Sequence, residues 1–288
     1  MIQKRVFIIG CIMTFFSVNT LQAQINPRLS KEVLGDIIKA IPSPLEISFL
    51  IKDLGIPYNS GYINAPAKVN GYKTAIKQAL NLGVYAIDAG YAYLYKKEKT
   101  TQYAFGANMK LAKKLKIGHL FDQKEWKEKV LKSNNFDSLL LQSNTTLEKI
   151  SDHFYEKKQS HFTILILTGG WLESLYITAH LALKYPNELL NNQIGEQKII
   201  LEQLLLLLSF YEELPEIKAL MVELNKLQKA YDNVEIKFEY NNPSTRVDTS
   251  EIMIVDDNTT TKIMLTTEVL RQIVATTKEI RAKVIAKD

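Results

Sequence analysis

The chain is 288 residues long, and 46% of its residues are hydrophobic while 23% are charged. This is the composition of a globular protein, so wholesale disorder is excluded. The single cysteine excludes an internal disulfide framework and a multi-cysteine metal site. The formal net charge of +5 is too small for this length to indicate a nucleic-acid-binding protein.

The first 23 residues have the pattern of an export signal. Lys4 and Arg5 give a short positive start, and residues 6–16 form an apolar stretch that is too short to span a bilayer. Ala23 is small enough to precede a signal-peptidase site, so we predict cleavage between Ala23 and Gln24. The mature chain would then begin at Gln24, and we expect it in the periplasm or in association with the outer membrane.

A second interpretation of the same segment gives Cys11 a role. The run Ile8-Ile9-Gly10-Cys11 fits the lipobox of bacterial lipoproteins, in which the cysteine is lipidated and becomes the first residue. The apolar run continues past Cys11 as far as Phe16, which favours cleavage at Ala23 and loss of Cys11. A lipid anchor at Cys11 is the alternative to a soluble exported form.

Helical periodicity dominates the mature chain, because apolar residues recur at spacings of three and four. The expected helices cover residues 29–41, 44–54, 72–97, 101–115, 122–131, 137–158, 162–183, 187–213, 215–232 and 266–287. We therefore predict a mainly α protein, in which residues 24–288 form a single domain built as a multi-helix bundle.

Two local signals within these helices carry most of the information. Ser43, Pro44 and Glu46 have the pattern of a capping box with proline at the first helical position. In the helix at 72–97, alanine and glycine recur at positions such as Gly83 and Gly90, and such a stripe of small residues lets another helix approach closely.

The segment 162–183 is the most apolar part of the mature chain, and its length approaches that of a membrane span. Glu173 lies at its centre, where a carboxylate is costly in lipid. We therefore expect a buried helix of the bundle, and no transmembrane anchor in the mature chain.

Near the C-terminus the period changes from helical to alternating. Residues 234–240 alternate apolar and charged side chains, which predicts a half-buried strand, and residues 241–245 have the composition of a loop. The segments 251–255 and 262–265 flank Asp256-Asp257-Asn258-Thr259 and are expected to pair as a small hairpin. This β excursion, over residues 234–265, precedes the last helix.

A first candidate site consists of Tyr85, Asp88, Tyr91 and Tyr95, which share one face of the helix at 72–97. Aromatic rings beside one carboxylate could line a pocket that stacks and hydrogen-bonds a small ligand. The alternative is an interface within the protein, in which a tyrosine hydroxyl or a backbone amide satisfies Asp88.

A second candidate site consists of Glu173, Tyr176 and His180, on one face of the helix at 162–183. A buried glutamate beside a histidine could act as an acid–base pair, since burial raises the pKa of the carboxyl and lowers that of the imidazole. The alternative is that Glu173 pairs with a partner and fixes the packing of the helix, while Gly169 and Gly170 admit a neighbour.

If these two helices face each other, Asp88 and Glu173 could form a paired-carboxylate site of the kind used by hydrolases. The four histidines have none of the spacings of a zinc motif, and the chain has no nucleophile elbow, phosphate-binding loop or dinucleotide fingerprint. We therefore assign no catalytic or metal-binding residue and predict no cofactor.

Residues 79–95 (ALNLGVYAIDAGYAYLY) and 169–176 (GGWLESLY) resemble segments of uncharacterised, exported, all-helical proteins of Bacteroidetes-type bacteria, many of which are lipoproteins. The resemblance implies a helical architecture and an envelope location, and it implies no activity. The function expected is a non-enzymatic scaffold that engages another cell-envelope protein. The alternatives are a small-ligand binding protein with a pocket lined by tyrosine and aspartate, and a carboxylate-based hydrolase.

Overall fold

The computed structural model of the chain describes residues 30–121, 136–239, 244–247, 253–256 and 260–288. The predicted signal peptide with Cys11 and the helix expected over 122–131 lie outside these residues.

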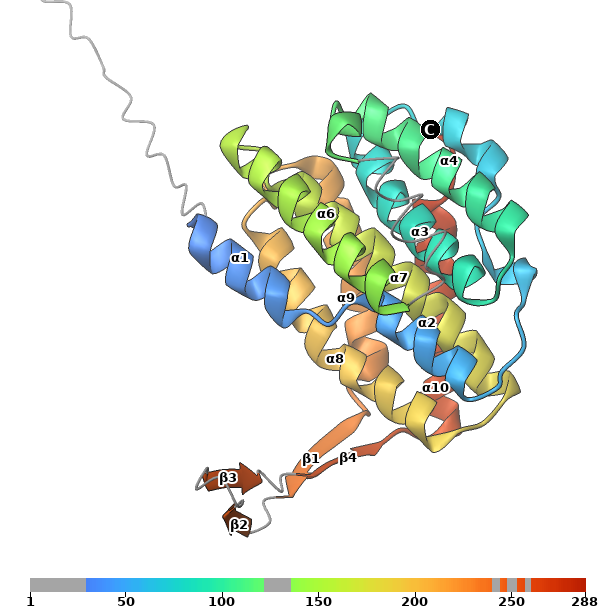
Figure 1. The fold of residues 1–288 in the computed structure, drawn as a ribbon, viewed down its shortest axis with the longest axis vertical. Helices are drawn as coiled ribbons and strands as arrows, with labels where there is room; N and C mark the ends of the chain where they lie inside the picture. Colours follow the sequence, from blue (N-terminus) through green and yellow to red (C-terminus); the bar gives the residue numbers. More distant parts are fainter. Residues whose placement is uncertain (1–29, 122–135, 240–243, 248–252, 257–259) are drawn as a thin grey trace, which may run out of the picture.

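Helices form the body of the protein, and the mainly α fold predicted from the sequence is confirmed (Figure 1). The nine α-helices of the described part are α1 (Lys31–Ala40), α2 (Pro44–Asp53), α3 (Ala75–Leu94), α4 (Glu98–Lys114), α6 (Phe136–Glu156), α7 (His161–Lys184), α8 (Glu188–Ser209), α9 (Pro215–Tyr231) and α10 (Thr267–Val284). The connections between the described helices include the short 3-10 turns η1 (Ser60–Tyr62), η2 (Pro66–Gly71) and η3 (Gly118–Leu120).

Side-chain caps explain where several helices begin. The hydroxyls of Ser30, Thr74 and Thr266 each accept a hydrogen bond from the first turn of the helix that follows. Pro44 begins α2 as predicted, but Ser43 makes no side-chain capping bond, and the N–H of Glu46 donates instead to the Ser43 carbonyl oxygen (3.0 Å). The capping box predicted at Ser43 and Glu46 is therefore wrong, although the helix start is correct.

Helices α3 and α7 form the centre of the body, and their backbones touch. A Cβ atom on Gly83 would overlap the carbonyl oxygen of Ile166, and one on Gly169 would overlap the carbonyl oxygen of Leu80. The close helix approach predicted from the small-residue stripe is therefore confirmed at Gly83. The contact places the two faces that carry Asp88 and Glu173 within one core.

Helix α7 is buried on nearly all sides. Within the described residues it is the one helix long and apolar enough to cross a membrane, and 94% of its most apolar window is buried inside the protein. Its predicted place as a core helix of the bundle agrees with this burial.

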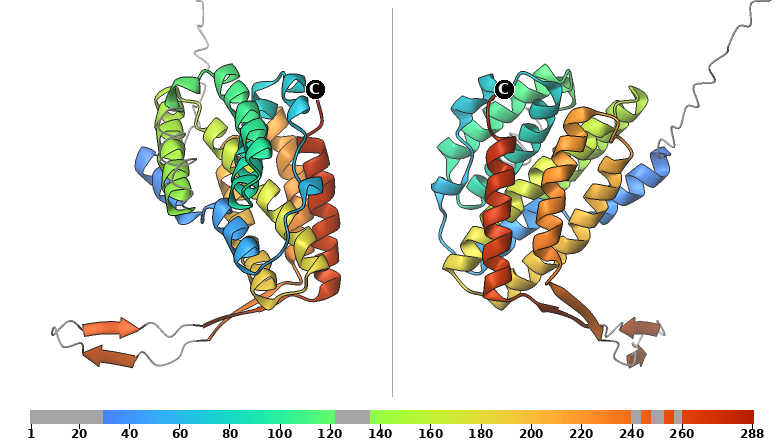
Figure 2. Two further views of the ribbon diagram at one scale, coloured as in Figure 1. Left: turned by 45° about the vertical axis from the view of Figure 1, so that its right-hand side comes forward. Right: turned by 180° about the vertical axis from the view of Figure 1, so that it is seen from behind.

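Helix α10 packs against α3, α7 and α9 and closes one side of the body (Figure 2). Its far end is tied to the start of α3, because the Asp288 carboxylate accepts from the backbone N–H groups of Lys73 (2.5 Å) and Thr74 (3.0 Å). Lys77 in turn donates to carbonyl oxygens at the C-terminal end of α10. Both ends thus satisfy backbone groups that the helices leave unpaired.

The β excursion is a two-part arm that extends away from the helices (Figure 2). Strand β1 (Glu235–Glu239) pairs with β4 (Thr260–Met264), and β2 (Ser244–Val247) pairs with β3 (Met253–Asp256), both antiparallel. The predicted pairing of 251–255 with 262–265 is therefore wrong, as is a loop over the whole of 241–245.

The contact between the arm and the helical body explains why β4 pairs with β1. The β1–β4 register places Ile236 opposite Ile263, and both half-buried side chains pack on the helical core. Gly195 of α8 makes room for Ile263, since a Cβ atom there would overlap its side chain. A hairpin between 251–255 and 262–265 would not place Ile236 beside Ile263 on the helical core, whereas the pairing of β1 with β4 does.

Candidate functional site

The predicted tyrosine face of α3 binds a segment of the chain itself. Its hydrogen bonds run from Tyr85 Oη to Ala65 O (2.9 Å), from Asn59 N to Tyr91 Oη (3.1 Å) and from Tyr95 Oη to Ile56 O (2.6 Å). Burial raises the pKa of each of these hydroxyls, so they stay protonated. The tyrosines therefore fasten residues 56–65 against α3, which is the structural alternative to a ligand-lining face.

Asp88 lies on the same face and is fully buried. Its Oδ2 accepts a hydrogen bond from the backbone N–H of Asn64 (3.0 Å). Burial raises the pKa of Asp88 well above its usual value, and the neighbouring charge of Glu173 and a hydrogen bond with that carboxyl raise it further. The carboxyl of Asp88 is therefore shifted toward its protonated form, in which Oδ1, an atom with no hydrogen-bond partner among the described residues, can serve as the donor to Glu173.

Glu173 forms a buried ion pair with Arg281. The guanidinium of Arg281, in α10, donates from Nε and Nη2 to the two carboxylate oxygens of Glu173 in α7. The same Nη2 donates to the Tyr62 carbonyl oxygen (2.8 Å), and the guanidinium stacks on the ring of Tyr176, 4.1 Å from its centroid. Four parts of the chain thus meet at one cluster: α3, α7, α10 and the segment before α3.

His180 does not share a proton with Glu173. Its Nδ1 lies 2.7 Å from the carbonyl oxygen of Tyr176, one turn earlier, and so carries the hydrogen that is donated. Burial lowers the pKa of His180, which keeps the ring neutral. Both Glu173 oxygens are taken by Arg281, so the cluster supports the alternative in which Glu173 pairs with a partner and fixes the packing of α7.

The structure therefore brings Asp88 and Glu173 together, as predicted for the case in which their two helices face each other. Both side chains are 0% exposed. A hydrolytic site needs access for substrate and water, so this sealed pair does not support the carboxylate-based hydrolase. Within the described ranges, no group of three or more histidine, cysteine, aspartate or glutamate side chains is placed to hold a metal ion.

Replacing Asp88 with asparagine tests its protonation. Because the folded chain holds this proton more tightly than the unfolded chain, wild-type stability falls as pH rises from 3.8 toward the raised pKa. Asparagine imitates the protonated acid, so the Asp88→Asn variant should lose less stability over that pH interval and be at least as stable at neutral pH. Urea unfolding at a series of pH values measures both quantities. A slope equal to that of the wild type would contradict the assignment.

Sequence reasoning missed Arg281, although a signal was present. Arg281 lies seven residues after Val274 and one after Ile280, so it falls within the apolar stripe of the last helix. A charged residue in such a stripe requires a buried partner, and Glu173 was the unpaired acid of the most apolar helix.

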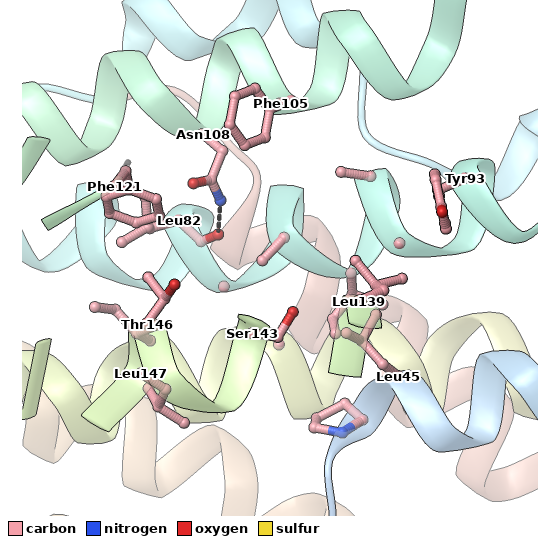
Figure 3. Close-up of a pocket in the computed structure, with 18 of the residues that line it drawn as sticks. Leu45, Leu82, Tyr93, Phe105, Asn108, Phe121, Leu139, Ser143, Thr146 and Leu147 are labelled. Carbon is pink, nitrogen blue, oxygen red and sulfur yellow. Dashed lines mark hydrogen bonds between the residues drawn. The ribbon is translucent and has the colours of Figure 1, made fainter. Parts of the chain in front are cut away.

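A second feature of the molecule is a cavity of about 710 Å³ on the opposite side of α3 (Figure 3). Its described walls come from α3, α4, α6, α7 and the start of α2. Figure 3 shows Asn108 of α4 and Ser143 of α6 pointing into this space from opposite sides. None of the candidate residues Tyr85, Asp88, Tyr91, Tyr95, Glu173, Tyr176 and His180 is among its described lining residues.

The walls of the cavity are apolar with a few neutral polar groups. The described lining residues include no lysine, arginine, histidine, aspartate or glutamate. Two of the polar donors are already used within the protein: Asn108 Nδ2 donates to the Leu82 carbonyl oxygen of α3 (2.8 Å), and Thr146 Oγ1 donates to that of Gln142 (2.7 Å). The cavity therefore offers an apolar surface that a hydrophobic molecule could fill.

The sequence signal for the cavity was the small-residue stripe itself. Gly83 lies against α7 and also lines the cavity, as do Ala86 and Ala89, and Ala86 is exposed. Small residues on one helix thus allow close contact at one point and leave open space a turn later.

Comparisons of this chain with protein-family models, with curated proteins and with solved structures give no match.

Proposed function

We propose that the chain is an exported cell-envelope protein that binds a small apolar ligand in the cavity between α3, α4, α6 and α7. The observation that carries the proposal is the cavity of about 710 Å³ with uncharged described walls. Pockets that hold small molecules are of this size and are mostly apolar, with a few polar groups. The predicted signal peptide over residues 1–23 and the resemblance to exported Bacteroidetes-type proteins support the envelope location.

Packing energetics favour a ligand over an empty space. The interior of a folded protein is close-packed, and each unfilled volume forfeits contacts that would stabilise the fold. Phe105, Met109 and Leu147 line the cavity and leave its space open. An apolar molecule bound there would supply the contacts that these side chains otherwise lack.

Native mass spectrometry of gently purified mature protein tests this function. We expect a mass in excess of the polypeptide that organic solvent releases, and saturable binding of the neutral fluorescent probe N-phenyl-1-naphthylamine by the delipidated protein. An unliganded spectrum together with no saturable probe binding would overturn the proposal. The polypeptide mass also distinguishes cleavage after Ala23 from lipidation at Cys11.

The second candidate function is the scaffold role, in which the protein engages another cell-envelope protein. The observation that favours it is the β arm, formed by β1 with β4 and β2 with β3, which extends from the body (Figure 2). Exposed strand edges are surfaces to which a partner strand can add. Crosslinking in cells should then yield a defined partner protein, and the crosslink should be lost when the arm is shortened. A crosslink that persists without the arm would count against this role.

A further inference from the structure

The cavity is elongated, and its long direction follows α3. Its described lining extends along α3 from Leu82 to Tyr93. At 1.5 Å per residue this distance is about 16 Å. Figure 3 shows Phe121 and Leu147 near one end of this space and Tyr93 and Leu139 near the other. Such a shape suits an extended hydrocarbon chain.

Four of the described lining residues are exposed, and three of these belong to α4 and α6. Gln102 and Gly106 lie one turn apart on α4, and Asn144 lies on α6. The side-chain amides of Gln102 and Asn144 form no hydrogen bond with any described residue, so both keep their donors and acceptors for another molecule. The exposed part of the lining on α4 and α6 thus carries two neutral amides that can both donate and accept hydrogen bonds.

We infer that the ligand is an amphiphile with an uncharged, hydrogen-bonding head, seated with its hydrocarbon tail along α3 and its head between Gln102 and Asn144. This inference rests on the proposed function and names the class of its ligand. The apolar walls bury the tail, and the two amides match hydroxyl or amide groups on the head. An ionised head gains no ion pair from the described lining, so it loses hydration without compensation.

A displacement series with three probes of equal tail length tests the class. Monododecanoylglycerol, dodecanoate and dodecyltrimethylammonium share a tail and differ in head charge, and each would displace N-phenyl-1-naphthylamine from the mature protein. We expect the glycerol ester to bind at least tenfold more tightly than either ionic amphiphile. Among shorter glycerol esters, each methylene removed should weaken binding by about fourfold.

Matched variants test where the probe binds and where the head of the amphiphile binds. A Cβ atom on Gly106 meets nothing within 4 Å, and the same holds for Gly35 of α1, which is not among the described lining residues. Tryptophan is a better helix former than glycine, so both Gly106→Trp and Gly35→Trp should fold. Gly106→Trp should weaken probe and ester binding at least tenfold, and Gly35→Trp should change neither. Asn144→Leu should weaken binding of the ester about fivefold relative to binding of the probe.

The outcomes separate the two proposals. If Gly106→Trp leaves probe binding unchanged, the cavity is not the binding site and the proposed function fails with the inference. If Gly106→Trp blocks the probe but dodecanoate or the ammonium compound binds as tightly as the ester, the function stands and the inference about the head is overturned.

Discussion

Replacing Arg281 with methionine is expected to lower the free energy of unfolding by about 3 to 5 kcal/mol, which is the cost of leaving one member of a buried ion pair without its partner. Glu173 is 0% exposed and both of its oxygens accept from Arg281, so no water can replace the lost donors without opening the core. The variant also removes the donor to the Tyr62 carbonyl oxygen. Urea unfolding followed by circular dichroism measures the loss.

The double variant Glu173→Met with Arg281→Met is the control. It removes both charges and fills the space with apolar side chains of similar length, so it should recover most of the stability lost in the single variant. An exposed pair of the same protein, Lys31 with Asp152, gives the comparison: Lys31→Met should leave the free energy of unfolding nearly unchanged. A loss at Arg281 as small as that at Lys31 would show that the buried pair does not hold α10 to the core.

Replacing Gly169 with alanine should destabilise the protein by about 3 kcal/mol, at the upper end of what overpacking costs. The added Cβ atom overlaps the carbonyl oxygen of Leu80, which belongs to the backbone of α3 and cannot rotate away. The two central helices must therefore separate. Thermal and urea unfolding of the purified variant both report this loss.

The neighbouring glycine provides a matched control for this prediction. A Cβ atom on Gly170 has its nearest neighbour at 3.5 Å, an ordinary contact, so Gly170→Ala should be tolerated. It should even gain up to about 1 kcal/mol, because alanine is the better helix former. Equal stability of the two alanine variants would mean that α3 and α7 are not in backbone contact at Gly169.

The sequence was most informative where a local rule decides the structure. Pro44 was expected at the first position of a helix, and α2 begins at this residue. The stripe containing Gly83 was expected to admit another helix, and α7 lies against it. Both outcomes depend on residues within one turn of each other, which a single sequence displays directly.

The features that the sequence did not predict depend on contacts between residues that lie far apart in the chain. Arg281 lies 108 residues from Glu173, and no local pattern states which acid a buried arginine meets. The predicted partner of β4 was wrong for the same reason, since the choice between a local hairpin with 251–255 and pairing with β1 depends on burial of Ile236 and Ile263 on the helical body. The cavity was missed because a stripe of small residues predicts close contact and empty space equally well.

The separation between Glu173 and Arg281 has a consequence for how the chain is made. During synthesis Glu173 emerges 108 residues before Arg281, so a nascent chain that already contains α3 and α7 has no guanidinium for its buried carboxyl groups. Closing the core at that stage would strand a charge in an apolar interior, at a cost of several kcal/mol. The buried cluster around Glu173 can therefore be completed only after α10 has been made, although the two helices that form the centre of the body, α3 and α7, precede it in the chain.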